Sequence, residues 1–162
     1  MDSVYIETSI ISHATAWPSK VPATLVMQAQ AKRWMLEIRP KYNIVTSQYV
    51  LDEAAQGDYE AARLRLELLA DIPLLPPHPQ VDAVVHEMIA RSLVPQVARL
   101  DAVHVATAAL AGVQYLLTQN CRHIANATVL PRLYRLLDAL GLPGLLICTP
   151  AEFLGGTENA EK

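Results

Sequence analysis

The feature that most constrains the fold of this chain is a recurring pattern in which a polar residue follows a short apolar segment or a helix start. A short apolar run, or the start of a helix, is followed at once by a carboxylate or an amide. In an open α/β sheet such positions lie where strands end and helices begin, so side chains far apart in sequence can converge there. Crowded carboxylates repel one another and favour a bound cation. Four residues hold such a place: Glu7, Glu53, Asp101 and Asn120.

Apolar periodicity predicts strands and helices that alternate along the chain, the pattern of an α/β protein with a parallel sheet. Expected strands cover 3–6, 43–46, 113–118 and 145–148, with a possible edge strand at 72–75. Expected helices run from Thr8 or Ser9, either of which suits an N-cap, to about Trp17, and then over 23–38, 47–57, 58–70, 81–92, 100–111 and 127–140. Ser47 and Asp58 are expected N-caps, and Gly112 an expected helix end.

Length and composition predict one domain with apolar surface to spare. A chain of 162 residues fits a single domain, which we assign to 1–154. The polar segment 155–162 has little to bury, and we expect it to be disordered. Because 52% of residues are apolar and only 18% are charged, some apolar surface is expected to meet a partner. A homodimer is the simplest such partner.

Several classes of protein are disfavoured by the composition. No apolar run approaches the ~18 residues of a membrane span, and the start of the chain lacks the basic region of a secretory signal, so we expect a cytoplasmic protein without membrane contact. Cys121 and Cys148 lack the paired spacing of a disulfide framework or a Cys-rich zinc site. A net charge of -3 excludes the broad basic surface of a strong non-specific nucleic-acid binder.

Four segments together resemble the ordered acidic motifs of PIN-domain nucleases, and the VapC-type toxins in particular. The resemblance runs from about Ser3 to Leu154, and its order and spacing are more specific than any single motif. It is carried by Tyr5-Ile6-Glu7-Thr8-Ser9, by Glu53, by Asp101-Ala102-Val103-His104-Val105-Ala106 and by Leu117-Thr118-Gln119-Asn120.

This resemblance implies a fold, a reaction and partners. The fold would be a three-layer α/β/α sandwich with a central parallel sheet and an acidic pocket at the carboxyl ends of its strands. The activity would be cleavage of RNA that depends on Mg²⁺ or Mn²⁺, restrained by a cognate protein antitoxin in a protein that usually dimerises. The chain departs from the commonest pattern where Glu7 replaces Asp and where Asn120 replaces a fourth acid.

A divalent cation bound by oxygen ligands is the chemistry that these residues favour. Mg²⁺ takes one or two carboxylates and keeps several waters, so three carboxylates suffice for one ion, which would orient an attacking water and polarise a phosphate. The predicted catalytic and metal-binding residues are Glu7, Glu53 and Asp101, with Asn120 as a further metal ligand. The predicted supporting or substrate-binding residues are Thr8, Ser9, His104 and Thr118. Crowding should raise the proton affinity of the three carboxylates and weaken metal binding in mild acid.

Each assignment has an ordinary structural alternative. Adjacent Asp52 competes with Glu53, but a helix turns them about 100° apart, and Asp52 shares the side of Gln48. Asp101 suits the first turn of a helix without any metal. His104, three residues on, could orient Asp101 or simply be a buried structural histidine. Asn120 could either bind a metal or cap a turn.

Two further functional hypotheses belong to other classes. A non-catalytic PIN-like binding module with a degenerate acidic pocket would account for Glu7 and Asn120, and such a protein would bind no Mn²⁺. A phosphoaspartyl protein would need an Asp nucleophile after a strand and a Lys partner near the last strands. The first strand instead ends in Glu7, and no lysine occurs between Lys41 and Lys162.

Overall fold

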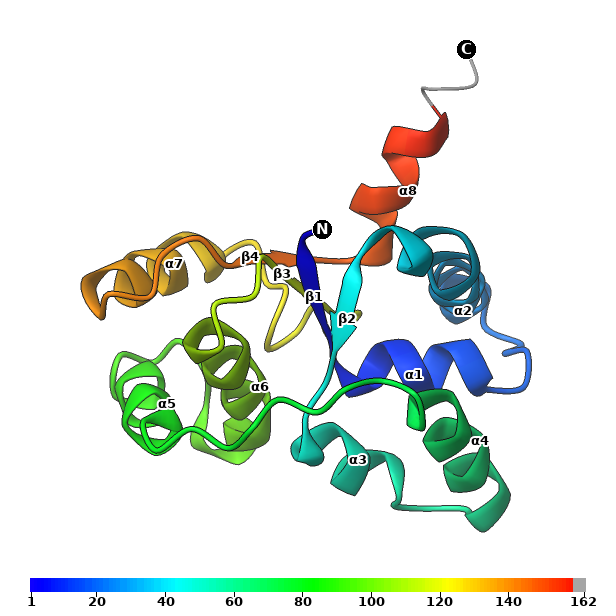
Figure 1. Ribbon diagram of the computed structural model, residues 1–162, viewed down its shortest axis with the longest axis horizontal. Helices are drawn as coiled ribbons and strands as arrows, with labels where there is room; N and C mark the ends of the chain where they lie inside the picture. The colour runs from blue at the N-terminus through cyan, green and yellow to red at the C-terminus, as the bar shows by residue number, and fades with distance from the viewer. Residues whose placement is uncertain (159–162) are drawn as a thin grey trace.

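The predicted α/β fold with a parallel sheet is confirmed in the computed structural model, which describes residues 1–158. All strand pairs are parallel, and the strand order is β2-β1-β3-β4 (Figure 1). Because β1 lies inside the sheet, its carboxyl end lies beside those of β2 and β3. The strands are β1 (Ser3–Ile6), β2 (Asn43–Val45), β3 (Tyr115–Leu117) and β4 (Leu146–Cys148).

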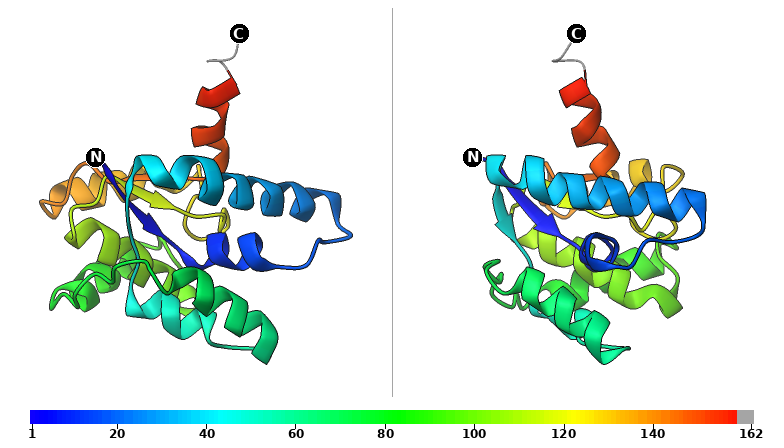
Figure 2. Two further views of the ribbon diagram at one scale, coloured as in Figure 1. Left: turned by 45° about the vertical axis from the view of Figure 1, so that its right-hand side comes forward. Right: turned by 90° about the vertical axis from the view of Figure 1, so that its right-hand side faces the viewer.

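Helices flank this sheet on both sides. Helices α1 and α2 lie on one side, and α5 and α6 on the other, whereas α3 and α4 lie near the carboxyl ends of β1 and β2 (Figures 1 and 2). The helices are α1 (Thr8–Thr15), α2 (Pro22–Arg33), the π-helix η1 (Trp34–Ile38), the 3-10 helix η2 (Arg39–Lys41), α3 (Gln48–Ala54), α4 (Tyr59–Leu69), α5 (Val81–Ala90), the 3-10 helix η3 (Gln96–Ala98), α6 (Arg99–Leu110), α7 (Leu130–Ala139) and α8 (Pro150–Glu158).

The core forms around β1, because a parallel strand covered on both faces must be apolar throughout. Val4, Tyr5 and Ile6 are fully buried, and the small residues of α6 allow that helix to pack closely on the sheet. Gly112 ends α6 with a φ of 70°, which a residue without a Cβ adopts at little cost. Glu7 therefore follows directly from the three buried residues of β1.

Helix caps explain where the elements near the sheet begin. As predicted, Ser47 caps α3 by accepting from the Val50 N–H, and Asp58 caps α4 by accepting from the Ala61 N–H. The prediction that Thr8 or Ser9 caps α1 is wrong. Glu7 itself is the cap, and its carboxylate accepts from the Ser9 N–H. An acidic cap suits this place because the helix dipole favours negative charge at its N-terminus.

The predicted edge strand over 72–75 is wrong in extent, because only an isolated parallel bridge forms there. It joins Thr46 to Leu74 through two backbone hydrogen bonds, from the Thr46 N–H to Pro73 O and from the Leu75 N–H to Thr46 O. Pro73 has no N–H to donate, and Pro76 lies just beyond, so the ladder cannot continue. Other element ends differ from expectation by a few residues.

The predicted disordered tail is wrong for 155–158, which belong to α8, whereas 159–162 lie outside the described residues. This helix stands out from the body of the molecule (Figures 1 and 2). Its first turn is held by Phe153, whose ring packs edge-on against Trp34 and Tyr115 at centroid distances of 5.8 and 5.3 Å. Glu152 also accepts from the Thr149 N–H at 3.1 Å, so a local cap and aromatic packing together support a helix that continues through Gly155. No described helix is long and apolar enough to cross a membrane.

Candidate metal centre

The candidate site lies at the carboxyl ends of β1 and β3, where the sheet order places the topological switch. From β1 the chain first continues to β2 on one side and later returns to β3 on the other. Ligands of open α/β sheets bind at such a point. The Glu7 N–H donates to Leu117 O at 3.1 Å, which fixes the end of β1 against the end of β3. Sheet pairing itself therefore sets where the Glu7 side chain begins.

Glu7 is 4% exposed and accepts three hydrogen bonds. The Ser9 N–H donates to its Oε2 at 2.9 Å, and the Ser9 hydroxyl donates to Oε1 at 2.6 Å. The Thr118 hydroxyl, at the end of β3, donates to Oε1 as well. In this structure Ser9 and Thr118 bind Glu7. Whether they also contact substrate stays a prediction. Their three bonds fix the carboxylate in one orientation.

Glu53 comes from α3 and points to the same place. Its Oε1 accepts from the Thr8 hydroxyl at 2.8 Å and pairs closely with His104 Nε2. The prediction that Glu53 rather than Asp52 points inward is confirmed. Asp52 is exposed and accepts instead from the Gln48 amide at 2.9 Å. Thr8 is a supporting residue of Glu53 in this structure, as Ser9 and Thr118 are of Glu7.

His104 on α6 is fully buried, as expected for a structural histidine, but its partners differ from the suggestion that it orients Asp101. Its Nδ1 lies 2.8 Å from the Tyr5 hydroxyl, and its Nε2 pairs with Glu53. Tyr5 in turn lies 2.7 Å from the hydroxyl of Ser47. Both ring nitrogens are therefore engaged, and neither is left for Asp101. Tyr5 and Ser47 were missed as site residues because a strand tyrosine and a helix cap have sufficient local explanations.

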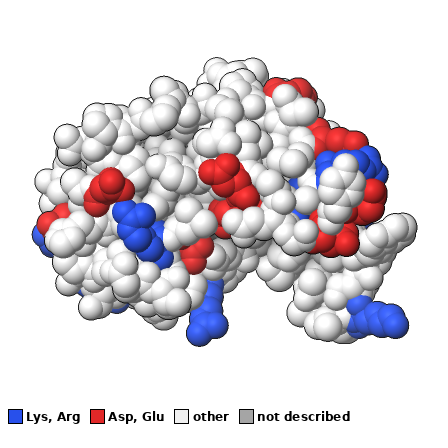
Figure 3. Space-filling view, turned by 90° about the horizontal axis from the view of Figure 1, so that it is seen from below, with Lys and Arg blue, Asp and Glu red and all other residues white. Residues whose placement is uncertain are grey.

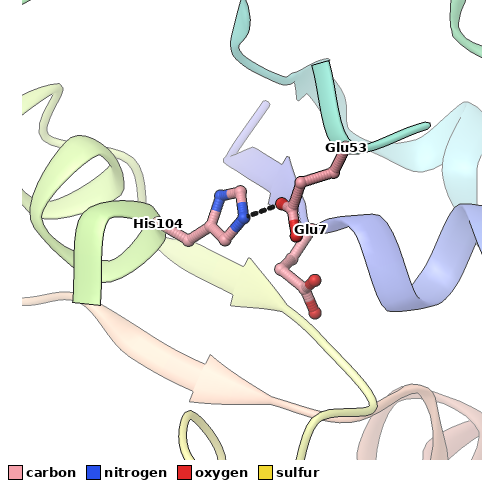
Figure 4. A group of neighbouring side chains, drawn as sticks. All are labelled: Glu7, Glu53 and His104. Atoms are coloured by element: carbon pink, nitrogen blue, oxygen red, sulfur yellow. Dashed lines mark hydrogen bonds and ion pairs between the residues drawn. The ribbon is translucent and has the colours of Figure 1, made fainter. Parts of the chain in front are cut away.

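Glu7, Glu53 and His104 form a compact group that could bind a metal ion. One ligand atom from each lies within 4.8 Å of the others. Figure 4 shows the three side chains converging from the end of β1, from α3 and from α6, with the pair between Glu53 and His104 marked. Glu53 is the outermost, with a side chain that is 25% exposed. Two carboxylates and an imidazole in this arrangement are a recurrent ligand set for divalent cations.

Asp101 lies near this group, although it is not one of the three residues within 4.8 Å of one another. Burial raises the pKa of its carboxyl, the charge of Glu7 adds to the rise, and a hydrogen bond with the Asn120 side chain offsets part of it. The Oδ1 of Asn120 also accepts from the His123 N–H at 3.1 Å, so the turn-capping alternative holds for that residue. Metal binding by Asp101 and Asn120 stays a prediction.

The pKa values of the acids do not all shift in the expected direction. Burial acts to raise the pKa of Glu53, but hydrogen bonds from His104 and Thr8, with the electrostatic attraction of the imidazole, outweigh it and lower that pKa. The pKa of Asp101 shifts in the predicted direction, with burial as the larger cause and the charge of Glu7 as the second. The two carboxyls differ because Glu53 has donors close to it, whereas the charge of Glu7 acts on Asp101.

The surface around the carboxyl ends of the strands is mixed in charge. Figure 3 views this end: acidic side chains lie near the middle, and the densest mixture of charges lies at the right, over α4. There Arg63 pairs with Glu60 and Glu67. Basic side chains appear on this face as separate groups. The local surface thus agrees with the absence of a broad basic field in the composition.

Comparison of the chain with models of known protein families and with curated proteins finds no match to either.

Proposed function

We propose that this protein is a metal-dependent endoribonuclease, a hydrolase of RNA phosphodiester bonds that serves as the toxin of a toxin–antitoxin pair. One observation carries the proposal: Glu7, Glu53 and His104 bring ligand atoms within 4.8 Å of one another at the switch point of a parallel sheet. RNA as substrate, an antitoxin as partner and the toxin role rest on the sequence resemblance to PIN-domain nucleases.

The donor set fits Mg²⁺ or Mn²⁺, because carboxylate oxygens dominate it. Glu7 and Glu53 would hold the ion, with Asp101 completing the acidic side. When bound, such an ion supplies charge neutralisation and polarisation of a phosphate. Glu53 is suited to this role because its Oε1 accepts from Thr8 and His104, whereas its Oε2 accepts no recorded bond from residues 1–158.

The chain itself would position the reacting groups. Ser9 and Thr118 hold the Glu7 carboxylate, so its orientation is set before substrate arrives. Asp101 has a pKa that burial and the charge of Glu7 raise, so a cation beside it is stabilising. Exposed Trp17, Leu36 and Tyr59 provide apolar surface on which an antitoxin or a second copy would pack.

The alternative is a non-catalytic PIN-like binding module, and one feature of the site favours it. Glu7 accepts three hydrogen bonds from its own chain, and the Oε1 of Glu53 accepts two, so both carboxylates have partners without an ion. The two functions differ in Mn²⁺ binding. Calorimetric titration that shows no Mn²⁺ binding to the purified protein would favour the binding module.

Cleavage of a defined single-stranded RNA tests the enzyme directly. We expect cleavage with Mg²⁺ or Mn²⁺, none with a chelator, and a loss of about 100-fold or more in both Glu7→Gln and Asp101→Asn, the size of effect seen when a group that stabilises the transition state is removed. Asp52→Asn is the matched control, since Asp52 is adjacent to Glu53 but turned away. Undiminished cleavage in either site variant removes that residue from the reaction.

A further inference from the structure

A buried chain of hydrogen bonds connects the interior of the protein to the candidate metal centre. It runs from Ser47 through Tyr5 to His104 Nδ1, and from His104 Nε2 to Glu53. Tyr5 and His104 are fully buried, and Ser47 is 2% exposed. Water therefore has little access to these groups, and each of them must find its partner within the protein.

The chain of bonds can be drawn in two directions, and counting donors separates them. If Ser47 donates to Tyr5, then Tyr5 donates to Nδ1 of His104 and every hydroxyl proton is used. If Nδ1 instead donates to Tyr5, then Tyr5 donates to Ser47, whose own proton lacks an acceptor among the recorded bonds of residues 1–158. The only other recorded partner of the Ser47 Oγ in this region is the Val50 N–H, itself a donor. An unsatisfied buried hydroxyl costs about 1–3 kcal/mol.

The contact between His104 and Glu53, at the other end of the chain of bonds, supports the first of the two directions. His104 Nε2 faces Oε1 of Glu53, which also accepts from Thr8 at 2.8 Å. A carboxylate oxygen can only accept, so an N–H on Nε2 is attractive, whereas a lone pair there would face negative charge. The first direction puts that N–H in place, because Nδ1 is then the acceptor. Both ends therefore require the same tautomer.

We propose that the hydrogen bonds run from Ser47 to Glu53, with Nδ1 of His104 as acceptor and Nε2 as donor, so that Tyr5 and His104 are positioning residues of Glu53 and His104 is not a metal ligand. The ion then takes its protein ligands from carboxylates alone, through the free Oε2 of Glu53. Carboxylates that bind metals are themselves commonly held by hydrogen bonds from outer partners. The inference rests on the proposed metal centre, but not on RNA as the substrate.

Nitrogen NMR of the imidazole rings tests the tautomer without any activity assay. In metal-free protein we expect the Nε2 of His104 to carry the proton and its Nδ1 to have the shift of a hydrogen-bonded acceptor, and we expect this pattern to persist when Mg²⁺ saturates the site. Loss of the Nε2 proton on adding Mg²⁺, or a proton on Nδ1 beforehand, would overturn the proposal.

Tyr5→Phe removes the hydroxyl that donates to Nδ1 while keeping the ring in the core. We expect Mn²⁺ affinity to fall by about tenfold, the lower end of the effect of removing an outer partner of a metal ligand, and the Nδ1 signal to shift. Tyr49→Phe is the matched control, because Tyr49 is partly exposed and outside the chain of bonds. Ser47→Ala keeps Tyr5 and should shift the Nδ1 signal in the same direction, which covers a Tyr5 variant that fails to fold.

The outcomes separate this inference from the proposed function. A protein that shows the expected tautomer and binds Mn²⁺ but cuts no RNA disproves the nuclease and retains the arrangement of His104. Equal Mn²⁺ affinity and an unchanged imidazole spectrum in a folded Tyr5→Phe variant disprove the positioning role, whether or not the protein is a nuclease.

Discussion

The two glutamates of the candidate site are held in different ways. Glu7 continues a buried strand and is fixed by the backbone pairing of β1 with β3 and by donors at the strand ends. Glu53 lies on a short surface helix, and among residues 1–158 its carboxylate is held by side chains from α1 and α6 alone. A ligand fixed by backbone pairing is set by the fold, whereas one fixed by side chains can be adjusted by single substitutions. The comparison predicts that changes near Glu7 affect folding and binding together, and that changes near Glu53 affect binding more.

The largest effect on metal binding is expected from Glu7→Gln. Removing an outer partner of a metal site costs 10- to 100-fold in affinity, so loss of a charged ligand should cost on the order of 100-fold or more in Mn²⁺ affinity. Calorimetric titration at neutral pH measures the change. Glu152→Gln, on the exposed start of α8, is a control for the loss of one negative charge. Equal losses in both variants would show a general charge effect.

The next largest effect is expected from pH. Protons compete with the ion for Asp101, whose pKa burial and Glu7 raise, so Mn²⁺ affinity should fall about tenfold between neutral pH and about pH 5. Titrations at both values check this for wild type and for Asp101→Asn, in which the fall should be smaller. An identical dependence in the two proteins would remove Asp101 from the site.

In the metal-free protein, the raised pKa of Asp101 makes stability fall as pH rises, whereas Mn²⁺ affinity is expected to rise with pH. A carboxyl whose pKa is raised on folding binds more protons in the folded state, so its contribution to stability falls as pH rises above the ordinary value of 3.8. Thermal unfolding in chelator should therefore show Asp101→Asn to be at least as stable as wild type at neutral pH, and to gain less from added Mn²⁺. A variant that is clearly less stable without metal would contradict the assigned direction of the pKa shift.

Thr118→Val tests the strand side of the comparison. It removes a buried donor to Glu7, and the free energy of unfolding should fall by about 1–3 kcal/mol, accompanied by weaker Mn²⁺ binding. Chemical denaturation measures the first effect and calorimetry the second. Thr128→Val is the control, since Thr128 is exposed and its hydroxyl donates to Asn126 Oδ1 within the same turn. If Thr118→Val loses no more stability than this control, the Thr118 hydroxyl is not needed to fix Glu7.

Thr8→Val tests the helix side and should have the smallest effect. Its hydroxyl donates to the partly exposed Glu53, which His104 continues to hold, so we expect a cost of about 0.5–1.5 kcal/mol in stability and a loss of a few-fold in Mn²⁺ affinity. The same two measurements apply. A loss of stability larger than that of Thr118→Val would reverse the comparison between the two glutamates.

Much of the fold could be predicted from local patterns. Alternating apolar segments predicted the four parallel strands, and Ser47 and Asp58 were recognised as caps because capping depends on neighbouring residues alone. The α8 helix was not predicted, although its start has a local signature: Pro150 is its first residue, and Glu152 accepts from the Thr149 N–H, as in a capping box. The packing of Phe153 on Trp34, far away in sequence, is the part that local patterns do not contain. Local composition around Gly155 suggested only a polar tail.

The candidate site was predictable in part for the same reason. The helical turn separating Asp52 from Glu53 is a local property, and it indicated the inward residue. The partners of His104 were not predictable, because Tyr5, Glu53 and His104 come from three elements that meet only in the folded protein. Side chains three residues apart on a helix share a face, but that geometry does not determine which partner the imidazole selects.

The use of Glu7 as the cap of α1 has a consequence for how an ion would be received. The carboxylate already completes the first turn of that helix, so it is ordered by the peptide whether or not a cation is present. Binding of a cation at this site would then require the ion to lose water ligands, but it would require no reorganisation of the main chain. Amide exchange at Ser9 and Ile10 should accordingly be as slow in chelated protein as in protein saturated with manganese.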